Sequence, residues 1–169
     1  MLAVRTDTPT AWDERSTLSV MLDYTRATVR AKCEGLSDPD ARVAPLATSP
    51  LTTIAGLVSH LRWVEHWWFQ VMFLGAQDEG PWTDEDPDAE MRLALQVPLA
   101  TLLDEYDEQA ERYRQMVSST DLEALSERTI SSGQRVTFRW VLLHLVEETA
   151  RHNGHIDLLR EMADGVKGA

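Results

Sequence analysis

The residue pair best suited to chemistry is Glu148 and His152, which lie four positions apart near the end of the chain. Side chains with this spacing stack one turn above the other on a helix, so both can reach a single ion. At about 100° per residue, both also fall within the apolar stripe that contains Val141 and Leu145. A carboxylate on a buried face is costly unless it is paired or binds a metal. The spacing therefore indicates either a buried acid–imidazole pair or two ligands of a divalent cation.

His60 can supply a third ligand from an earlier segment that has the same helical periodicity. It falls in the middle of the apolar stripe of that segment, whereas His66 falls on the opposite, polar face. Two imidazoles and one carboxylate suit zinc, and also nickel, iron or manganese, and they leave a coordination position open for water or substrate. We therefore predict one divalent metal ion bound by His60, Glu148 and His152. The alternative for His60 is a core histidine with a hydrogen-bonding partner.

Two further histidines, His144 and His155, flank the ligand face of the last segment. We expect them at the rim of the site or behind the ligands, where they are candidates for proton transfer or for orienting Glu148. No other catalytic residue is assigned. The single cysteine, Cys33, is expected to be packed in the core rather than reactive.

The chain is rich in tryptophan, with six in total. Trp63, Trp67 and Trp68 crowd the segment that carries His60, where they are expected in the core or on a dimer surface in preference to a substrate pocket. Trp82 lies in a loop rich in proline, glycine and acids, and is expected either to plug the core or to form the rim of a site.

Helical segments must position these residues. Apolar residues at three- and four-residue spacings predict helices over about 13–34, 51–74, 98–118 and 138–163, with a short helix over 88–96. Ser49 and Pro50 suit the start of the second helix, while Gly35, Gly75 and Gly165 suit helix ends. The sequence therefore predicts an all-α four-helix bundle with long connecting loops, folded as a single domain over residues 1–169.

The stretch over 125–137, within the connection over 118–137, lacks a helical period. Its SSGQ centre, flanked by 128–130 and 135–137, favours a small hairpin. The shape of a binding pocket depends on this connection and on the loop over 75–98, so the substrate is not identified from the sequence.

Composition restricts the function classes. A formal net charge of −12 and a pI near 4.7 disfavour nucleic-acid binding, because a phosphate backbone would be repelled over most of the surface. One cysteine excludes an internal disulfide and fits a reducing compartment. The chain shows neither a signal-peptide pattern nor an apolar run long enough for a membrane span, so we expect a cytoplasmic protein without membrane partners.

Two segments, GLVSHLRWVEHWWF (56–69) and WVLLHLVEETARHNGHIDLLRE (140–161), resemble the DinB-like superfamily of metal-binding four-helix proteins, and most closely its mini-circle-type branch. The resemblance implies one histidine ligand from the second helix and two ligands from the last, which match His60, Glu148 and His152. Many members have histidine in place of Glu148, but mycothiol-dependent maleylpyruvate isomerases are similar to this chain in having glutamate there. His155 stands where many members have glutamine, so no ligand role is carried over to it.

The resemblance also implies an activity. Members of the superfamily include thiol-dependent S-transferases and isomerases that use mycothiol, bacillithiol or glutathione, so we expect a small-molecule substrate and a low-molecular-weight thiol. The alternative is a metal-binding stress or small-molecule-binding protein without turnover. A homodimer is expected as well, since members of the superfamily pair and small bundles with exposed aromatic residues often do so.

Overall fold

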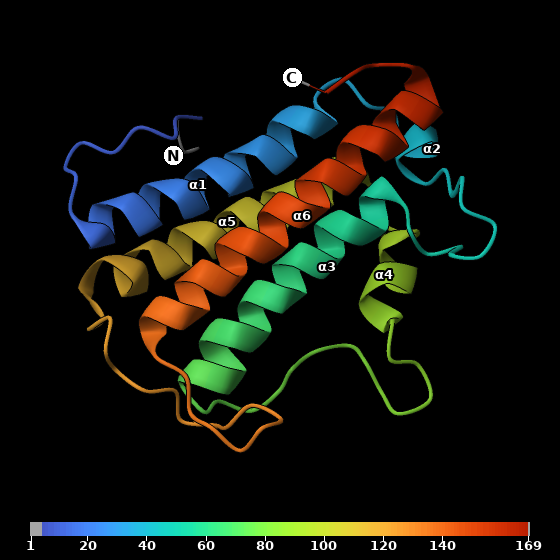
Figure 1. Ribbon diagram of the computed structural model, residues 1–169. Helices are drawn as coiled ribbons and strands as arrows, with labels where there is room; N and C mark the ends of the chain where they lie inside the picture. The colour runs from blue at the N-terminus through green and yellow to red at the C-terminus, as the bar shows by residue number, and fades with distance from the viewer. Residues whose placement is uncertain (1–4, 169) are drawn as a thin grey trace.

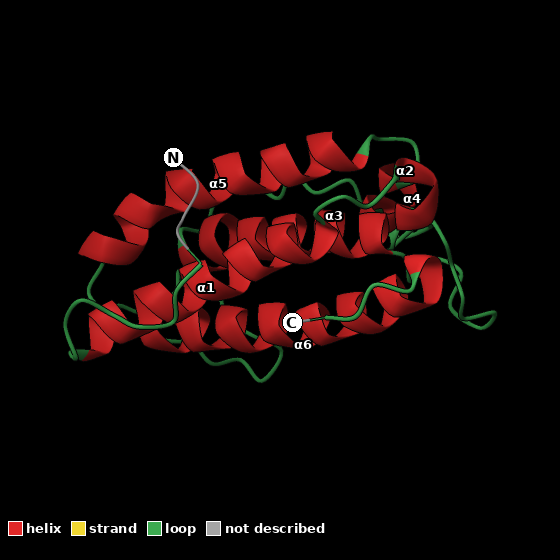
Figure 2. Cartoon of the chain, turned by 90° about the horizontal axis from the view of Figure 1, so that it is seen from above, coloured by secondary structure: helices red, strands yellow, loops and turns green. Residues whose placement is uncertain are grey.

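Four long helices form the body of the protein in the computed structural model, which describes residues 5–168 (Figure 1). They are α1 (Glu14–Cys33), α3 (Ile54–His66) with its continuation η1 (Trp67–Phe73), α5 (Leu99–Ser119) and α6 (Phe138–Asp164); the short helices α2 (Asp38–Ala41) and α4 (Ala89–Ala94) lie in the connections. α1 and α6 run in one direction, and α3 and α5 run in the other. Each long helix packs against two others, which closes a four-helix bundle (Figure 2). The expected all-α fold is confirmed.

Side-chain caps define where three of the four long helices begin. Asp13 caps α1 and Thr137 caps α6, each by accepting a hydrogen bond from a backbone N–H of the first turn. The prediction that the second helix begins directly after Pro50 was wrong by three residues. Thr53 caps α3 instead, because its Oγ1 accepts from the Gly56 N–H at 2.9 Å. Gly165 ends α6 in the left-handed conformation, with φ of 79°.

The predicted second helix changes its winding near its middle. From Trp67 to Phe73 it continues as the π-helix η1, and the Leu74 N–H bonds to the Phe69 carbonyl, five residues back, at 3.1 Å. A π-turn takes more residues per turn than an α-turn, so it rotates the side chains that follow it. The segment that carries the tryptophans therefore departs from the regular 100° spacing on which the sequence prediction relied.

The connections also differ from expectation in two places. The chain after Gly35, where no helix was predicted, forms the short helix α2, since Ser37 caps it and proline is tolerated in a first turn. The predicted hairpin over 128–137 forms no strand within residues 5–168. Its backbone makes a turn, with Ile130 N–H bonded to the Gln134 carbonyl at 2.9 Å, and a single isolated bridge joins Leu125 to Thr137.

The core consists of two apolar clusters separated by a polar layer. One cluster lies around Leu57, Leu61, Leu103 and Ile156, and the other around Leu22, Phe69, Phe138 and Leu145. Between these positions along the helices lie the buried polar side chains of Arg26, Glu65, Glu148, Thr149 and Asn153.

Arg26 and Glu65 form a buried ion pair in this polar layer. The guanidinium of Arg26 donates Nε–H to Glu65 Oε1 at 2.8 Å and Nη2–H to Oε2 at 2.6 Å, and the Tyr106 hydroxyl donates to Oε1 at 3.0 Å. The pair links α1 to α3, and Tyr106 adds α5. Sequence reasoning did not identify it.

None of the helices within residues 5–168 combines the length and apolar character that a membrane span requires.

Candidate metal centre

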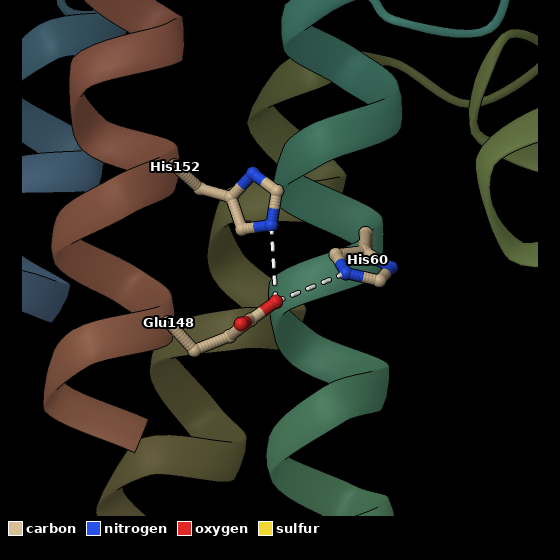
Figure 3. A group of neighbouring side chains, drawn as sticks. All are labelled: His60, Glu148 and His152. Carbon is tan, nitrogen blue, oxygen red and sulfur yellow. Dashed lines mark hydrogen bonds and ion pairs between the residues drawn. The ribbon is translucent and has the colours of Figure 1, made fainter. Parts of the chain in front are cut away.

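His60, Glu148 and His152 converge between α3 and α6 (Figure 3). Each offers one ligand atom, and these atoms all lie within 4.8 Å of one another. Glu148 Oε1 lies 3.1 Å from His152 Nε2 and 3.5 Å from His60 Nε2, so both imidazoles direct the same ring nitrogen at the carboxylate. The structure therefore brings together the three residues that the sequence singled out.

The burial of the three residues is uneven. Glu148 is only 7% exposed, and the His152 side chain is 12% exposed, whereas 26% of the His60 side chain is reached by solvent. The two imidazole rings meet edge to face, with centroids 5.1 Å apart. The centre is thus closed on the α6 side and accessible beside His60.

Glu148 is held in its ionised form. Burial raises the pKa of its carboxyl, but the neighbouring Arg151 and His152 outweigh burial, and the pKa lies below its ordinary value. Arg151 donates from Nη2 to Glu148 Oε2, so one oxygen pairs with the guanidinium and the other faces the imidazoles.

His152 is held in its neutral form. Burial and the proximity of His60 lower its pKa, and together they outweigh the attraction of Glu148. A neutral imidazole and an ionised carboxylate are the protonation states that metal binding requires.

Each imidazole also has a partner on its other ring nitrogen. His60 Nδ1 lies 3.1 Å from Glu90 Oε1, and His152 Nδ1 lies 3.2 Å from His155 Nδ1. Partners of this kind fix the tautomer and the orientation of histidine ligands in metal sites. Glu90 was missed by sequence reasoning, because its distance of thirty residues from His60 gave no spacing signal; only its place in the predicted short helix pointed to an ordered position.

The two flanking histidines differ in position. His155 is exposed and contacts His152, in keeping with a place behind a ligand. His144 stacks on Trp140 at a centroid distance of 5.0 Å and meets Trp68 edge to face at 4.7 Å, so it belongs to an aromatic cluster one turn before Glu148. His66, as predicted, lies away from the centre and lines a separate cleft with Arg62 and Tyr113.

A cavity of about 250 Å³ adjoins His60. Its wall is largely indole, and its lining residues are His60, Trp63, Val64, Trp67, Trp68, Trp82 and Glu90. Trp68 is a core residue as expected and Trp67 packs against the same core cluster, but both also line the cavity, together with the half-buried Trp63. Trp82 does not plug the core; it lines this cavity, where its ring meets Trp63 at a centroid distance of 5.8 Å.

The donor set fits a divalent cation. Two imidazole Nε2 atoms and one carboxylate oxygen, with Glu90 and His155 behind the imidazoles, make a ligand set that zinc and several other first-row metals accept. Three protein ligands leave room for at least one exogenous ligand, and His60, the most exposed of the three, also lines the tryptophan-lined cavity.

Comparison with known proteins identifies the family. No protein with curated records shows significant similarity to the chain. Residues 17–165, which include every helix apart from the first turn of α1, match the family model described as mycothiol-S-transferase. The match confirms the resemblance to DinB-like proteins, and the chain belongs to the mycothiol S-transferase family.

Proposed function

We propose that the protein is a metal-dependent transferase that joins the sulfur of a low-molecular-weight thiol, mycothiol or a close analogue, to a small electrophile. The related alternative is an isomerase, in which the thiol adds reversibly to the substrate. One observation carries the proposal: in a member of this family, three ligand atoms lie within 4.8 Å of one another beside a tryptophan-lined cavity.

His60, Glu148 and His152 would hold one divalent cation, and we propose zinc, with nickel, iron and manganese as alternatives. Such an ion would lower the pKa of a thiol at its open position, so that the thiol is nucleophilic at neutral pH. The ionised Glu148 offsets part of the positive charge, and Arg151 keeps its second oxygen turned away from the imidazoles.

The side chains around the cavity would position the second substrate. The indoles of Trp63, Trp67 and Trp82 offer flat apolar surfaces, which would keep water from the reacting atoms once a substrate is bound. In the transfer step a sulfur–carbon bond forms, and the leaving group departs with its bonding electrons. His144, which contacts the cavity wall at Trp68, is the candidate for proton exchange with that leaving group; His155 is the candidate for orienting His152.

The test compares alanine variants of two histidines on α3, His60 and His66. Protein purified without an affinity tag is loaded with zinc, and transfer of mycothiol to an alkyl halide reporter is measured. We expect His60→Ala to lose the ion and its kcat/KM to fall by more than about 100-fold. Mutation of a mere hydrogen-bonding partner of a metal ligand already lowers metal affinity or activity by about 10–100-fold. His66→Ala should retain both. Equal activity of the two variants would contradict the proposal.

The alternative function, metal-dependent binding without turnover, has a distinct outcome in the same experiment. Zinc binding that disappears in His60→Ala, with no thiol transfer by the wild-type protein to any of a panel of electrophiles, would favour it. We further propose a cytoplasmic location, where such thiols are found reduced, and a homodimer, in keeping with the pairing of members of the superfamily.

A further inference from the structure

The cavity beside His60 has indole rings in its wall that lie in different planes. Trp63 and Trp82 meet with their planes at 77°, and Trp67 and Trp68 meet with their planes at 86°. Two rings at right angles can both contact a rounded group, whereas a flat ligand can stack on only one of them. The arrangement of the indoles therefore favours a rounded ligand over a flat one.

The same cavity has a buried carboxylate in its wall. Glu90 is 6% exposed, and its Oε1 lies 3.1 Å from His60 Nδ1. Its Oε2 is buried and has no hydrogen-bond partner among residues 5–168. A buried carboxylate oxygen without a partner is costly in apolar surroundings, and a positive charge close to it removes part of that cost.

The wall itself does not supply this positive charge from an arginine or lysine. None of the described residues that line the cavity is of either type. Arg62 lies over the ring of Trp63, with its Cζ 4.7 Å from the ring centroid, but it lines the neighbouring cleft and pairs with Glu105 at 3.2 Å. A ligand that enters the cavity can therefore bring the positive charge.

We propose that this cavity binds a small organic cation, an alkylated ammonium group, between the indoles and Glu90. A cation is attracted to the face of an indole ring, and quaternary ammonium groups are recognised by aromatic rings in this way. A quaternary ammonium group has no N–H to satisfy, so it needs only apolar contact and negative charge nearby, and this wall offers both. The cavity volume of about 250 Å³ is below the usual range for drug-sized ligands and suits one small group.

The connection that carries Trp82 adds negative charge beside the cavity. Residues 75–88 include six aspartates and glutamates and no lysine or arginine. One of them, Asp78, accepts a hydrogen bond from Trp82 Nε1 at 2.9 Å and so holds this indole in place. Charge of one sign around a cleft raises the local concentration of ligands of the opposite sign, so this connection favours the entry of a cation.

The inference gives the substrate class of the proposed transferase, an electrophile that carries an alkylated ammonium group. His60 lines the cavity and belongs to the candidate metal centre, so the remainder of a molecule bound by its ammonium group would lie beside that centre. The role of the cation as substrate rests on the proposed function, whereas its binding rests on the cavity alone.

The first experiment compares two ligands that differ in one charge. The full chain is titrated calorimetrically, in chelator so that binding is measured apart from the metal. The ligands are choline and its neutral isostere, in which carbon replaces the nitrogen. We expect choline to bind about 10–30-fold more tightly, the ratio typical of a desolvated cation on aromatic rings. Equal affinities for the two ligands overturn the proposal.

Two variants test which side chains recognise the charge. Glu90→Gln keeps an amide oxygen for His60 but removes the charge, and Trp82→Leu removes one indole from a connection outside the helices. We expect each to weaken choline binding by about 10-fold and to leave the neutral isostere within about twofold. The matched controls are Glu108→Gln on the exposed face of α5 and Trp12→Leu, whose side chain is 82% exposed. Choline affinity that is unchanged in both Glu90→Gln and Trp82→Leu overturns the assignment.

The second experiment separates this inference from the proposed function. Zinc-loaded protein and mycothiol are given either bromoethyl-trimethylammonium or its neutral carbon isostere. The thiolate sulfur forms a bond to the carbon that carries bromine, and bromide leaves with the bonding electrons. Each rate is divided by the rate with the thiol alone, and we expect this ratio to be about 10-fold higher for the cation.

The two ideas fail in different ways in these experiments. Tight binding of choline without transfer to either bromide would contradict the proposed transferase and leave the cation site standing. Transfer to both bromides with equal ratios, together with equal binding of choline and its isostere, would overturn the cation site and leave the transferase standing.

Discussion

The carboxylate of Glu148 is shared between two kinds of neighbour, and this sharing sets the chemistry of the centre. One oxygen accepts from Arg151, and the other faces Nε2 of His152 and His60. Without a cation, an imidazole N–H can donate to the second oxygen. A metal ion would take the place of that proton and bind all three side chains. The lowered pKa values of Glu148 and His152 already favour the ionised carboxylate and the neutral imidazole that metal binding requires.

Glu90 is the residue whose removal tests the support of this arrangement. Its Oε1 contacts His60 Nδ1, and its Oε2 is buried without a partner among the described residues. We expect Glu90→Ala to weaken zinc binding by about 10–100-fold, because His60 loses the acceptor that orients it. Glu90→Gln should retain much of the affinity, since its amide oxygen can accept the same hydrogen bond. A competitive chelator titration measures both, with Glu85→Ala in the exposed loop as the control; equal affinities for all three variants would exclude this role.

Cys33 provides a prediction about the source of the sulfur. Burial raises the pKa of its thiol to about 12, so at pH 8 only about one molecule in ten thousand carries the thiolate. Alkylation of the folded protein by iodoacetamide at pH 8 should therefore be about a thousandfold slower than that of free cysteine. Unfolding in urea should restore the normal rate. Rapid native alkylation, followed by mass spectrometry, would show that the chain carries a reactive thiol of its own and would weaken the case for an external one.

At the scale of the helices, the polar layer ties the bundle together at mid-height. Arg26 on α1 and Glu65 on α3 are 3% and 1% exposed, and breaking a buried ion pair leaves an uncompensated charge. We expect Glu65→Leu to lower the free energy of unfolding by about 3–5 kcal/mol. The double variant Arg26→Met/Glu65→Leu should be markedly more stable than the single one, because it removes both charges. Urea denaturation of the wild type, the single variant and the double variant measures these free energies of unfolding. A single variant as stable as the wild type would mean that the pair is solvated in solution.

The helices show which features of this structure could be predicted from the sequence and which could not. Apolar periodicity located all four long helices and placed His60, Glu148 and His152 on inward faces, because each of these properties depends only on spacing along one helix. Partners from different helices leave no such trace. Arg26 and Glu65 meet through packing across 39 positions, and Glu90 reaches His60 across 30. The start of α3 at Thr53 and the π-winding of η1 depend on local hydrogen bonds that compete closely with the α-helical alternative.

For the whole molecule, the candidate metal centre would link distant parts of the chain. His60 on α3 and His152 on α6 meet edge to face across the candidate site, and an ion bound to both would join the two helices. Because the folded chain binds the ion and the unfolded chain presents its ligands far apart, the ion should stabilise the fold by mass action. The same linkage makes stability a direct measure of the site, independent of any catalytic assay.

Metal removal therefore has a predictable effect on stability. At a free zinc concentration about 100 times the Kd, the free energy of unfolding should rise by about 2.7 kcal/mol over the metal-free protein. For a domain of this length, this corresponds to an increase of roughly 5–10 °C in melting temperature. The increase should vanish in His60→Ala and His152→Ala. It should persist in His66→Ala, the matched control, which removes an imidazole from α3 outside the candidate site. A differential scanning measurement with and without chelator decides the matter. An equal zinc response in His60→Ala and His66→Ala would show that zinc stabilises the chain from another site, and the assignment of the centre would fail.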